Sequence, residues 1–149
     1  MPMADHSLDE PELYERLDSH GLLGRIAGLP EQIAGAWAAA RALDLPARYH
    51  GATEIVVLGM GGSGIGGALL QALAVDLGSQ TPVRVVRGYR LPAFVGEHAL
   101  VLASSNSGDT EETVDAFGQA FKHGAMCVAI ASGGRIAAMA RDEIGRAHV

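Results

Sequence analysis

Short apolar runs alternate with segments of helical periodicity from residue 53 onward. The runs 54–58, 83–86, 99–103 and 126–131 are each four to six residues long and nearly continuous in Val, Ile, Leu, Ala and Met. Strands without polar alternation are typical of a parallel sheet that is buried on both faces. The pattern therefore predicts an α/β fold, a doubly wound parallel sheet of four to five strands with helices on both faces and right-handed crossovers.

Three helices are expected between and after these strands. The first carries an apolar stripe that should face the sheet and ends at Gly78; the stripe is Ile65, Ala68, Leu69, Ala72, Leu73 and Leu77. The second has Asp109 as its N-cap and a buried face of Val114, Phe117 and Phe121. The third opens at Ser132-Gly133-Gly134 and buries Ile136, Met139, Ala140 and Ile144. The loop after residue 86 should contain a turn of helix.

The first 46 residues precede any strand and read as a helical extension. A capping box at Ser7-Leu8-Asp9-Glu10 predicts a short helix with Leu13, Tyr14 and Leu17 inward. The segment His20–Gly24 reads as a turn, and a longer helix is expected from Pro30 to about Leu43. We expect two parts, residues 1–46 and a domain over 47–149, and we expect that domain to stop short of its last strand.

Composition and charge narrow the possible functions. The chain has 149 residues, enough for one core, and its formal net charge of −6 excludes a general nucleic-acid binder. The single cysteine, Cys127, forms no intrachain disulfide, which fits a reducing, cytoplasmic setting. No signal peptide or membrane span is visible.

The run Gly59-Met60-Gly61-Gly62-Ser63-Gly64 joins the first strand to the first helix. Backbone N–H groups at such a turn bind anions, and the spacing fits the dinucleotide fingerprint twice. The second strand ends in Arg87 rather than in the acidic residue that binds the ribose of NAD. An NADP site using Arg87 stays open, as does a purely structural role in which the glycines serve helix–strand packing. Gly66 and Gly67 imply a close neighbour, either a ligand or another part of the chain.

A second polar cluster, Ser104-Ser105-Asn106-Ser107-Gly108-Asp109-Thr110, follows the third strand. Its hydroxyls and backbone N–H groups lie before another helix, a composition suited to a phosphate. Charge-assisted hydrogen bonds of about 1.5–3 kcal/mol each would exceed the repulsion from nearby exposed carboxylates. Ordinary turn and capping chemistry would explain only some of these residues.

Three motifs in this order resemble the sugar isomerase (SIS) domain, a flavodoxin-like fold. They are 57–67 with its glycine turn, the serine loop through Thr113, and Ser132-Gly133-Gly134-Arg135. In particular they resemble the first half of the bifunctional phosphoglucose/phosphomannose isomerases. The resemblance extends from about Leu29 to the end and includes the run 87–92.

The resemblance implies roles for individual residues. Gly61, Gly62 and Ser63 should lie along the sugar, while Ser105, Ser107 and Thr110 should hold its phosphate. Arg135 is the implied catalytic residue, a cation that stabilises the enediolate. The ligand is then a phosphorylated hexose, with no metal and no nucleotide cofactor.

Two positions depart from the family pattern, and one function is missing. Asn106 stands where many relatives have tyrosine, and Asp109 where asparagine is common. Relatives take the catalytic base and acid, a glutamate and a histidine, from their second SIS half, and we find no counterpart in this sequence. The six histidines read as surface or loop residues. The family implies a homodimer or pairing with a second SIS half.

The leading hypothesis is therefore the SIS half of an aldose–ketose isomerase that acts on glucose 6-phosphate or mannose 6-phosphate and is incomplete by itself. The alternative is a non-catalytic regulatory module that binds a sugar phosphate through the same loops. An NADP-binding domain remains a third interpretation.

Overall fold

The structure is a computed structural model and describes residues 11–143 of the chain. The chain divides into two compact units, Met1–Leu43 and Asp44–Val149. The described part of the first unit is helical, with α1 (Pro11–Leu17), α2 (Leu22–Ala27) and α3 (Leu29–Arg41). The predicted capping box at residues 7–10 and the predicted core residue Ile144 lie outside the described residues.

The first unit corrects two expectations. Leu17 is exposed, although Leu13 is buried as predicted. Helix α2 begins inside the stretch expected to be a turn, because the Asp18 carboxylate accepts hydrogen bonds from the backbone N–H groups of Leu22 (2.6 Å) and Leu23 (2.8 Å). These bonds lower the pKa of Asp18. The spacing of apolar residues gave no sign that Asp18 caps a helix.

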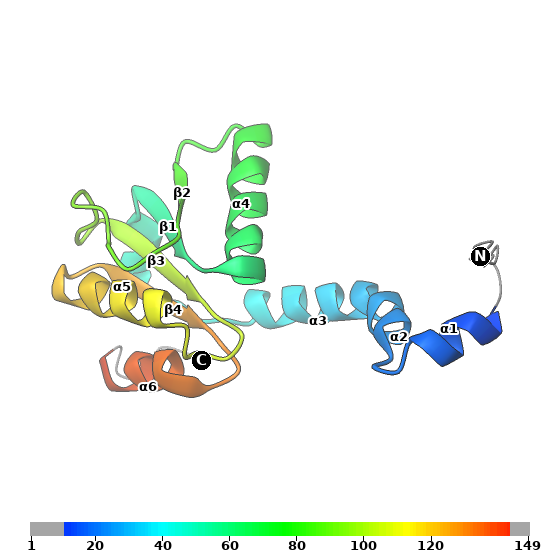
Figure 1. Cartoon of the computed structure of the whole chain (residues 1–149). Coiled ribbons are helices and arrows are strands. Elements are labelled where there is room, and N and C mark those ends of the chain that lie inside the picture. Colours follow the sequence, from blue (N-terminus) through cyan, green and yellow to red (C-terminus); the bar gives the residue numbers. More distant parts are fainter. Residues whose placement is uncertain (1–10, 144–149) are drawn as a thin grey trace, which may run out of the picture. The chain divides into compact units, whose positions relative to one another are not determined.

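Over residues 44–143, the second unit contains a short 3₁₀ helix, four strands and three helices (Figure 1). In chain order they are η1 (Ala47–Gly51), β1 (Glu54–Leu58), α4 (Gly61–Asp76), β2 (Val83–Val86), β3 (Ala99–Ser104), α5 (Glu111–Lys122), β4 (Met126–Ile130) and α6 (Gly134–Glu143). All strand pairings are parallel, in the order β2-β1-β3-β4. The predicted strands and the parallel α/β fold are thus confirmed.

The connection from β2 to β3 contains no helix, contrary to expectation. Instead the loop is tied to α5 by Gln119, whose side chain donates to the carbonyl of Tyr89 (2.7 Å) and accepts from the N–H of Leu91 (3.0 Å). His123 adds a 3.0 Å contact from Nδ1 to the carbonyl of Val95. Side-chain hydrogen bonds from α5 thus hold this loop, in which a turn of helix was predicted.

Helices cover both faces of the sheet. Val56 and Leu58 of β1 join the core cluster with Phe117 of α5 and Ile136 of α6. Val57 points to the opposite face, toward α4, because successive strand residues alternate in direction. Figure 1 shows α4 on one side of the sheet and α5 and α6 on the other.

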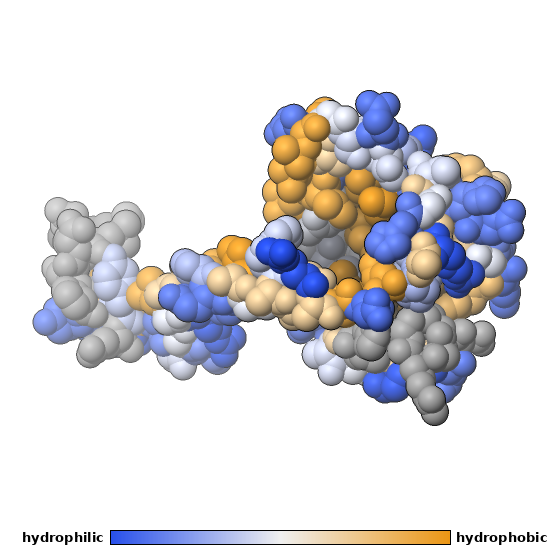
Figure 2. Space-filling model, turned by 180° about the vertical axis from the view of Figure 1, so that it is seen from behind, coloured by the Kyte–Doolittle hydropathy of each residue, from blue (hydrophilic) through white to orange (hydrophobic). Residues whose placement is uncertain are grey.

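Helix α4 packs through its glycines rather than through its predicted apolar stripe. Gly64 and Gly67 are the buried residues of α4. The large members of the expected stripe face solvent: Ile65 is 57% exposed, Leu69 67%, Leu73 52% and Leu77 75%. Figure 2 shows the resulting apolar surface over α4. The orientation predicted for this helix was therefore wrong, because a glycine face lies closer to a sheet than a leucine face can.

A buried tyrosine links η1 to the last strand. Tyr49 is 4% exposed. Its hydroxyl donates to the carbonyl of Cys127 (3.0 Å) and accepts from the N–H of the same residue (3.3 Å). Cys127 belongs to β4, which is an edge strand of the described sheet. Tyr49 thus satisfies backbone groups on an edge of the sheet that no other described strand covers.

Candidate functional site

The glycine turn carries the chain from β1 into α4 within two residues. Gly61, the first residue of α4, has a φ of +50°, which a side chain would disfavour. A Cβ atom on Gly64 would lie 2.7 Å from the carbonyl oxygen of Gly59, so this glycine is required by the turn itself. A Cβ on Gly62 or Gly66 would meet nothing within 4 Å. Only some of the glycines therefore serve packing, and the others leave open space beside the turn.

Arg87 lies against this turn. Its guanidinium Nη2 donates to the carbonyl of Gly64 at 3.3 Å. A Cβ on Gly64 would also lie 3.0 Å from Arg87 Nε. The arginine considered for NADP binding thus contacts the first turn of α4, where it stabilises a backbone carbonyl.

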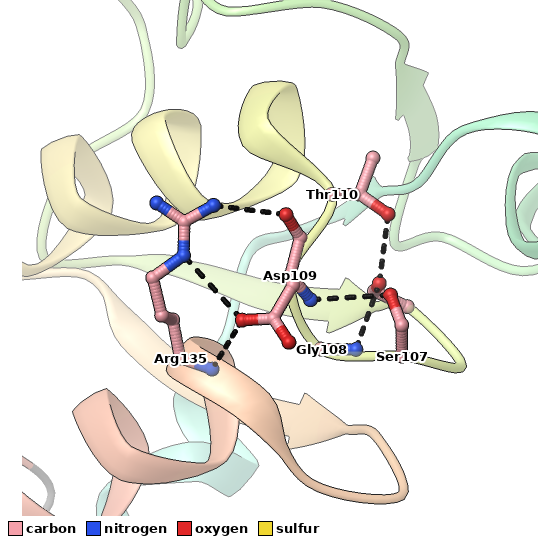
Figure 3. Close-up of polar contacts among 6 residues, drawn as sticks. Ser107, Gly108, Asp109, Thr110 and Arg135 are labelled. Atoms are coloured by element: carbon pink, nitrogen blue, oxygen red, sulfur yellow. Dashed lines mark hydrogen bonds and ion pairs between the residues drawn. The ribbon is translucent and has the colours of Figure 1, made fainter.

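The serine loop between β3 and α5 is ordered by its own hydroxyls (Figure 3). The Ser105 and Thr110 hydroxyl oxygens are 2.9 Å apart, and Ser105 Oγ also accepts from the N–H of Gly108 at 3.2 Å. Ser107 Oγ accepts from the N–H of Asp109 at 3.2 Å. In the Ser105–Thr110 pair only one hydroxyl can donate to the other, and the hydrogen of Ser107 is not used in its bond. At least two hydroxyl hydrogens therefore remain to bind an anion.

The glycine turn and the serine loop form the two sides of one open cleft of about 570 Å³. Its lining residues are Met60, Gly62, Ser63, Ser105, Asn106, Ser107 and Thr110. An adjoining cleft of about 390 Å³ shares Ser63 and Asn106 and reaches Ser132. The carboxyl ends of β1, β3 and β4 thus place three loops around two clefts that share Ser63 and Asn106.

The electrostatics of the cleft favour an anion. Helices α4 and α5 begin beside it, and neither has a side-chain cap on its first N–H groups. The unpaired donors and the helix dipoles make both ends positive. No side chain that lines the cleft carries a charge, although Glu111 and Glu112 follow in the first turn of α5. The anion would thus be held by backbone N–H groups and hydroxyls.

Arg135 and Asp109 join the serine loop to the loop before α6 (Figure 3). The Asp109 carboxylate oxygen Oδ1 accepts from the backbone N–H of Arg135 at 3.0 Å and lies 3.4 Å from its Nε. Arg135 Nη2 donates to the backbone carbonyl of Asp109 at 2.9 Å. The prediction that Asp109 caps α5 was therefore wrong; its carboxylate caps α6, and Thr110 occupies the N-cap position of α5.

The remaining contacts between these two loops involve backbone atoms. The N–H of Ser132 donates to the carbonyl of Asn106 (3.1 Å), and the Ser132 hydroxyl donates to the same oxygen. The N–H of Ile136 donates to the carbonyl of Gly108 (2.9 Å). The two loops are thus held as one unit.

The structure brings most of the predicted site residues together. Gly62, Ser63, Ser105, Ser107 and Thr110 line the same cleft. Gly61 starts α4 beside them, and Arg135 is held on Asp109, outside the set of lining residues. Met60, which was not predicted, lines the cleft from within the glycine turn. Its position between two glycines of the motif was the available signal.

Two kinds of feature are absent from residues 11–143. No group of three or more His, Cys, Asp or Glu side chains in this range is arranged to hold a metal ion. None of the helices between these residues is long and apolar enough to cross a membrane.

Sequence comparisons identify relatives of one kind. A bifunctional phosphoglucose/phosphomannose isomerase of Caldicellulosiruptor bescii is 39% identical over 118 residues, which are 79% of this chain and 34% of the relative. One of the same name from Thermoplasma acidophilum is 44% identical over 92 residues, 62% of this chain and 28% of the relative. The chain thus spans about a third of the length of these curated relatives. No family model matches it.

Structure comparison supports the fold. The crystal structure of a hypothetical protein superposes with a TM-score of 0.58 at 24% sequence identity. The match covers 80% of this chain and 64% of the other. At this level of identity the likeness concerns the arrangement of strands and helices.

Proposed function

Because this chain belongs to the sugar isomerase (SIS) domain family, we propose that its cleft binds a phosphorylated hexose and serves aldose–ketose isomerisation. The observation that carries the proposal is the convergence of the serine loop and two uncapped helix N-termini on one cleft. Such a site offers hydrogen-bond donors to an anion and faces it with no carboxylate among the lining residues.

The phosphate belongs at the serine loop. Ser105 is 2% exposed and fixed by two hydrogen bonds, so its hydroxyl is preorganised, while Ser107 and Thr110 follow it along the loop. The sugar would then extend along Gly62 and Ser63, where the absence of a side chain on Gly62 leaves room. We place Gly61 beside Gly62 and Ser63, on the same side of the bound sugar.

The proposed reaction is a proton transfer without net oxidation. A general base removes the C2 proton of the open-chain aldose, and the electron pair forms the C1–C2 double bond of an enediolate whose negative charge rests on O1. The O2 hydroxyl proton then passes to O1, and as C2–O2 becomes a carbonyl the base returns its proton to C1, which gives the ketose. Arg135 is proposed to stabilise the enediolate as a fixed cation.

The proposed base must come from outside this cleft. None of the residues that line it has a side chain that titrates near neutral pH. We propose that a second SIS half, in the same polypeptide or in a partner subunit, supplies the base and the ring-opening acid. Cytoplasmic location is part of the same proposal, since the described cysteine, Cys127, is an unpaired thiol.

Glucose 6-phosphate and mannose 6-phosphate are the proposed substrates, from the names of the relatives. Calorimetric titration of the chain with each of them, and with unphosphorylated glucose, tests the binding part. Exchange of the C2 proton with deuterium from solvent, followed by NMR on the chain paired with a second SIS half, tests the chemistry. Failure of the folded chain to bind either sugar phosphate would contradict the proposal.

A non-catalytic sugar-phosphate-binding module is the second candidate. It is favoured by the uncharged lining of the cleft and by the engagement of Arg135 with Asp109. Saturable binding with no exchange at C2, in the complete gene product, would favour this module over the isomerase.

A further inference from the structure

We propose that Asp109 is a positioning residue, which sets the place of the Arg135 guanidinium relative to the loop that binds the phosphate. This inference rests on the proposed function and deepens it. Asp109 is a position where the sequence departs from the family pattern, and the structure brings it against the arginine predicted to act on the sugar.

The contacts fix Arg135 at two levels. The bond from its backbone N–H to Asp109 Oδ1 (3.0 Å) anchors the start of α6. The Nη2 bond to the Asp109 carbonyl (2.9 Å) and the Nε approach to Oδ1 (3.4 Å) hold one edge of the guanidinium. A side chain with several rotatable bonds is thereby restricted before any ligand arrives, and preorganised charge is what stabilises a transition state without a reorganisation cost.

One edge of the guanidinium is left for a ligand. The guanidinium of arginine has five N–H groups on three nitrogens. Two of these nitrogens, Nε and Nη2, face Asp109. Within residues 11–143, Arg135 Nη1 donates no hydrogen bond. That nitrogen can donate to an oxygen that gains negative charge, while the opposite edge stays on Asp109.

The same loop carries both functions. The N–H of Asp109 donates to Ser107 Oγ, and Thr110, the next residue, contacts Ser105 Oγ. The hydroxyls proposed for the phosphate and the anchor of Arg135 thus lie within six consecutive residues. Asp109 sets the distance between the bound phosphate and the cation through a short, hydrogen-bonded path.

Geometry rather than charge is the proposed contribution of Asp109. An asparagine at this position still has an Oδ1 that accepts from the N–H of Arg135, whereas an alanine has none. The asparagine side chain would also remove one negative charge near the phosphate. We therefore expect Asp109→Asn to preserve the positioning and Asp109→Ala to abolish it.

The experiment measures two affinities of the whole chain by calorimetry. One ligand is glucose 6-phosphate, and the other is a phosphorylated aldonohydroxamate, which carries negative charge where the enediolate would. Wild type should prefer the hydroxamate. In Asp109→Ala the ratio of the two affinities should fall about tenfold. The affinity for glucose 6-phosphate should stay within about twofold of wild type, since the loop hydroxyls are unchanged. Asp109→Asn should retain the preference.

Two controls separate this inference from the proposed function and from misfolding. Glu111→Gln removes one charge from the same region without touching Arg135 and should leave the preference unchanged. Circular dichroism melting shows whether each variant is folded. If wild type binds neither phosphorylated ligand, the proposed function fails. If wild type binds both and prefers the hydroxamate, but Asp109→Ala keeps that preference or Asp109→Asn loses it, the positioning role of Asp109 is overturned.

Discussion

Gly67 of α4 lies so close to Val57 of β1 that a Cβ atom on the glycine would be 2.8 Å from Val57 Cγ1. Val85 Cγ2, on the neighbouring strand, would be 3.2 Å away. These two valines belong to the sheet and cannot withdraw without moving their strands. The contact therefore sets how closely α4 approaches the sheet, and with it the position of the glycine turn at the start of α4.

Replacing Gly67 by alanine should destabilise the protein. Overpacking of this kind costs about 1–3 kcal/mol, less the gain of up to about 1 kcal/mol from alanine in a helix. Urea denaturation of Gly67→Ala measures the difference. Gly66→Ala is the matched control, because a Cβ there meets nothing within 4 Å, and this variant should gain about 0.5–1 kcal/mol. Equal effects in the two variants would contradict the packing role.

Ser105→Ala should weaken sugar-phosphate binding more than it weakens the fold. The N–H of Gly108 keeps a partner in the backbone carbonyl of Ser105 (3.1 Å), so the loop loses no backbone bond. The phosphate would lose one charge-assisted hydrogen bond of about 1.5–3 kcal/mol, a factor of roughly 10 to 100 in Kd. Calorimetry with glucose 6-phosphate measures it. Ser79→Ala, beyond the far end of α4, is the control and should bind like wild type.

Stability should fall at high pH because of Cys127. Burial raises the pKa of this thiol to about 12, whereas a cysteine in the unfolded chain has a pKa of about 8.5. Between these values the unfolded chain binds fewer protons than the folded one, so each pH unit lowers the free energy of unfolding by about 1.4 kcal/mol. Below about pH 8.5 the effect vanishes.

Cys127→Ala separates this effect from other groups that titrate at high pH. The variant should be less stable than wild type near pH 7, because it leaves a cavity, and the gap should narrow as the pH rises toward about 11. Chemical denaturation at several pH values provides the comparison. A gap that stays constant over this range would show that the thiol does not remain protonated in the folded protein.

Tyr49→Phe tests the bond between η1 and the edge strand. The variant leaves the N–H and the carbonyl of Cys127 without their 3.3 Å and 3.0 Å partner inside the core. A buried unsatisfied group costs about 1–3 kcal/mol. Thermal and urea unfolding measure the loss. Tyr89→Phe, at a position 49% exposed, should change stability by no more than about 0.5 kcal/mol.

The strands were predictable because their residues meet the same environment on both faces. Each is a nearly unbroken apolar run, and the predicted bounds of β1 and β2 agree with the structure. Helix α4 was not predictable in the same way, because it has two candidate faces. Its leucines form an apolar stripe, but its glycines permit closer contact with β1 and β2, and the closer packing determines which face is buried.

The loops that form the candidate site could be predicted from the sequence, but the hydrogen bonds between them could not. The hydroxyls of Ser105, Ser107 and Thr110 fall together because they share one loop at the carboxyl end of a strand. The carboxylate of Asp109 had two helix starts within reach, one next in sequence and one 26 residues away. Spacing favours the near one, and only the fold shows that the distant N–H of Arg135 is its partner.

The contact between Gly108 and Gly134 sets a limit on how this protein can vary. Both residues have positive φ, and a Cβ on Gly108 would collide with the carbonyl of Gly133, while one on Gly134 would lie 2.5 Å from the carbonyl of Ser107. Neither loop can gain a side chain at this crossing or change length without displacing the other. Any redesign that gives either glycine a side chain must therefore also rebuild the loop that it faces, so residues 104–110 and 131–136 vary as a pair at this crossing.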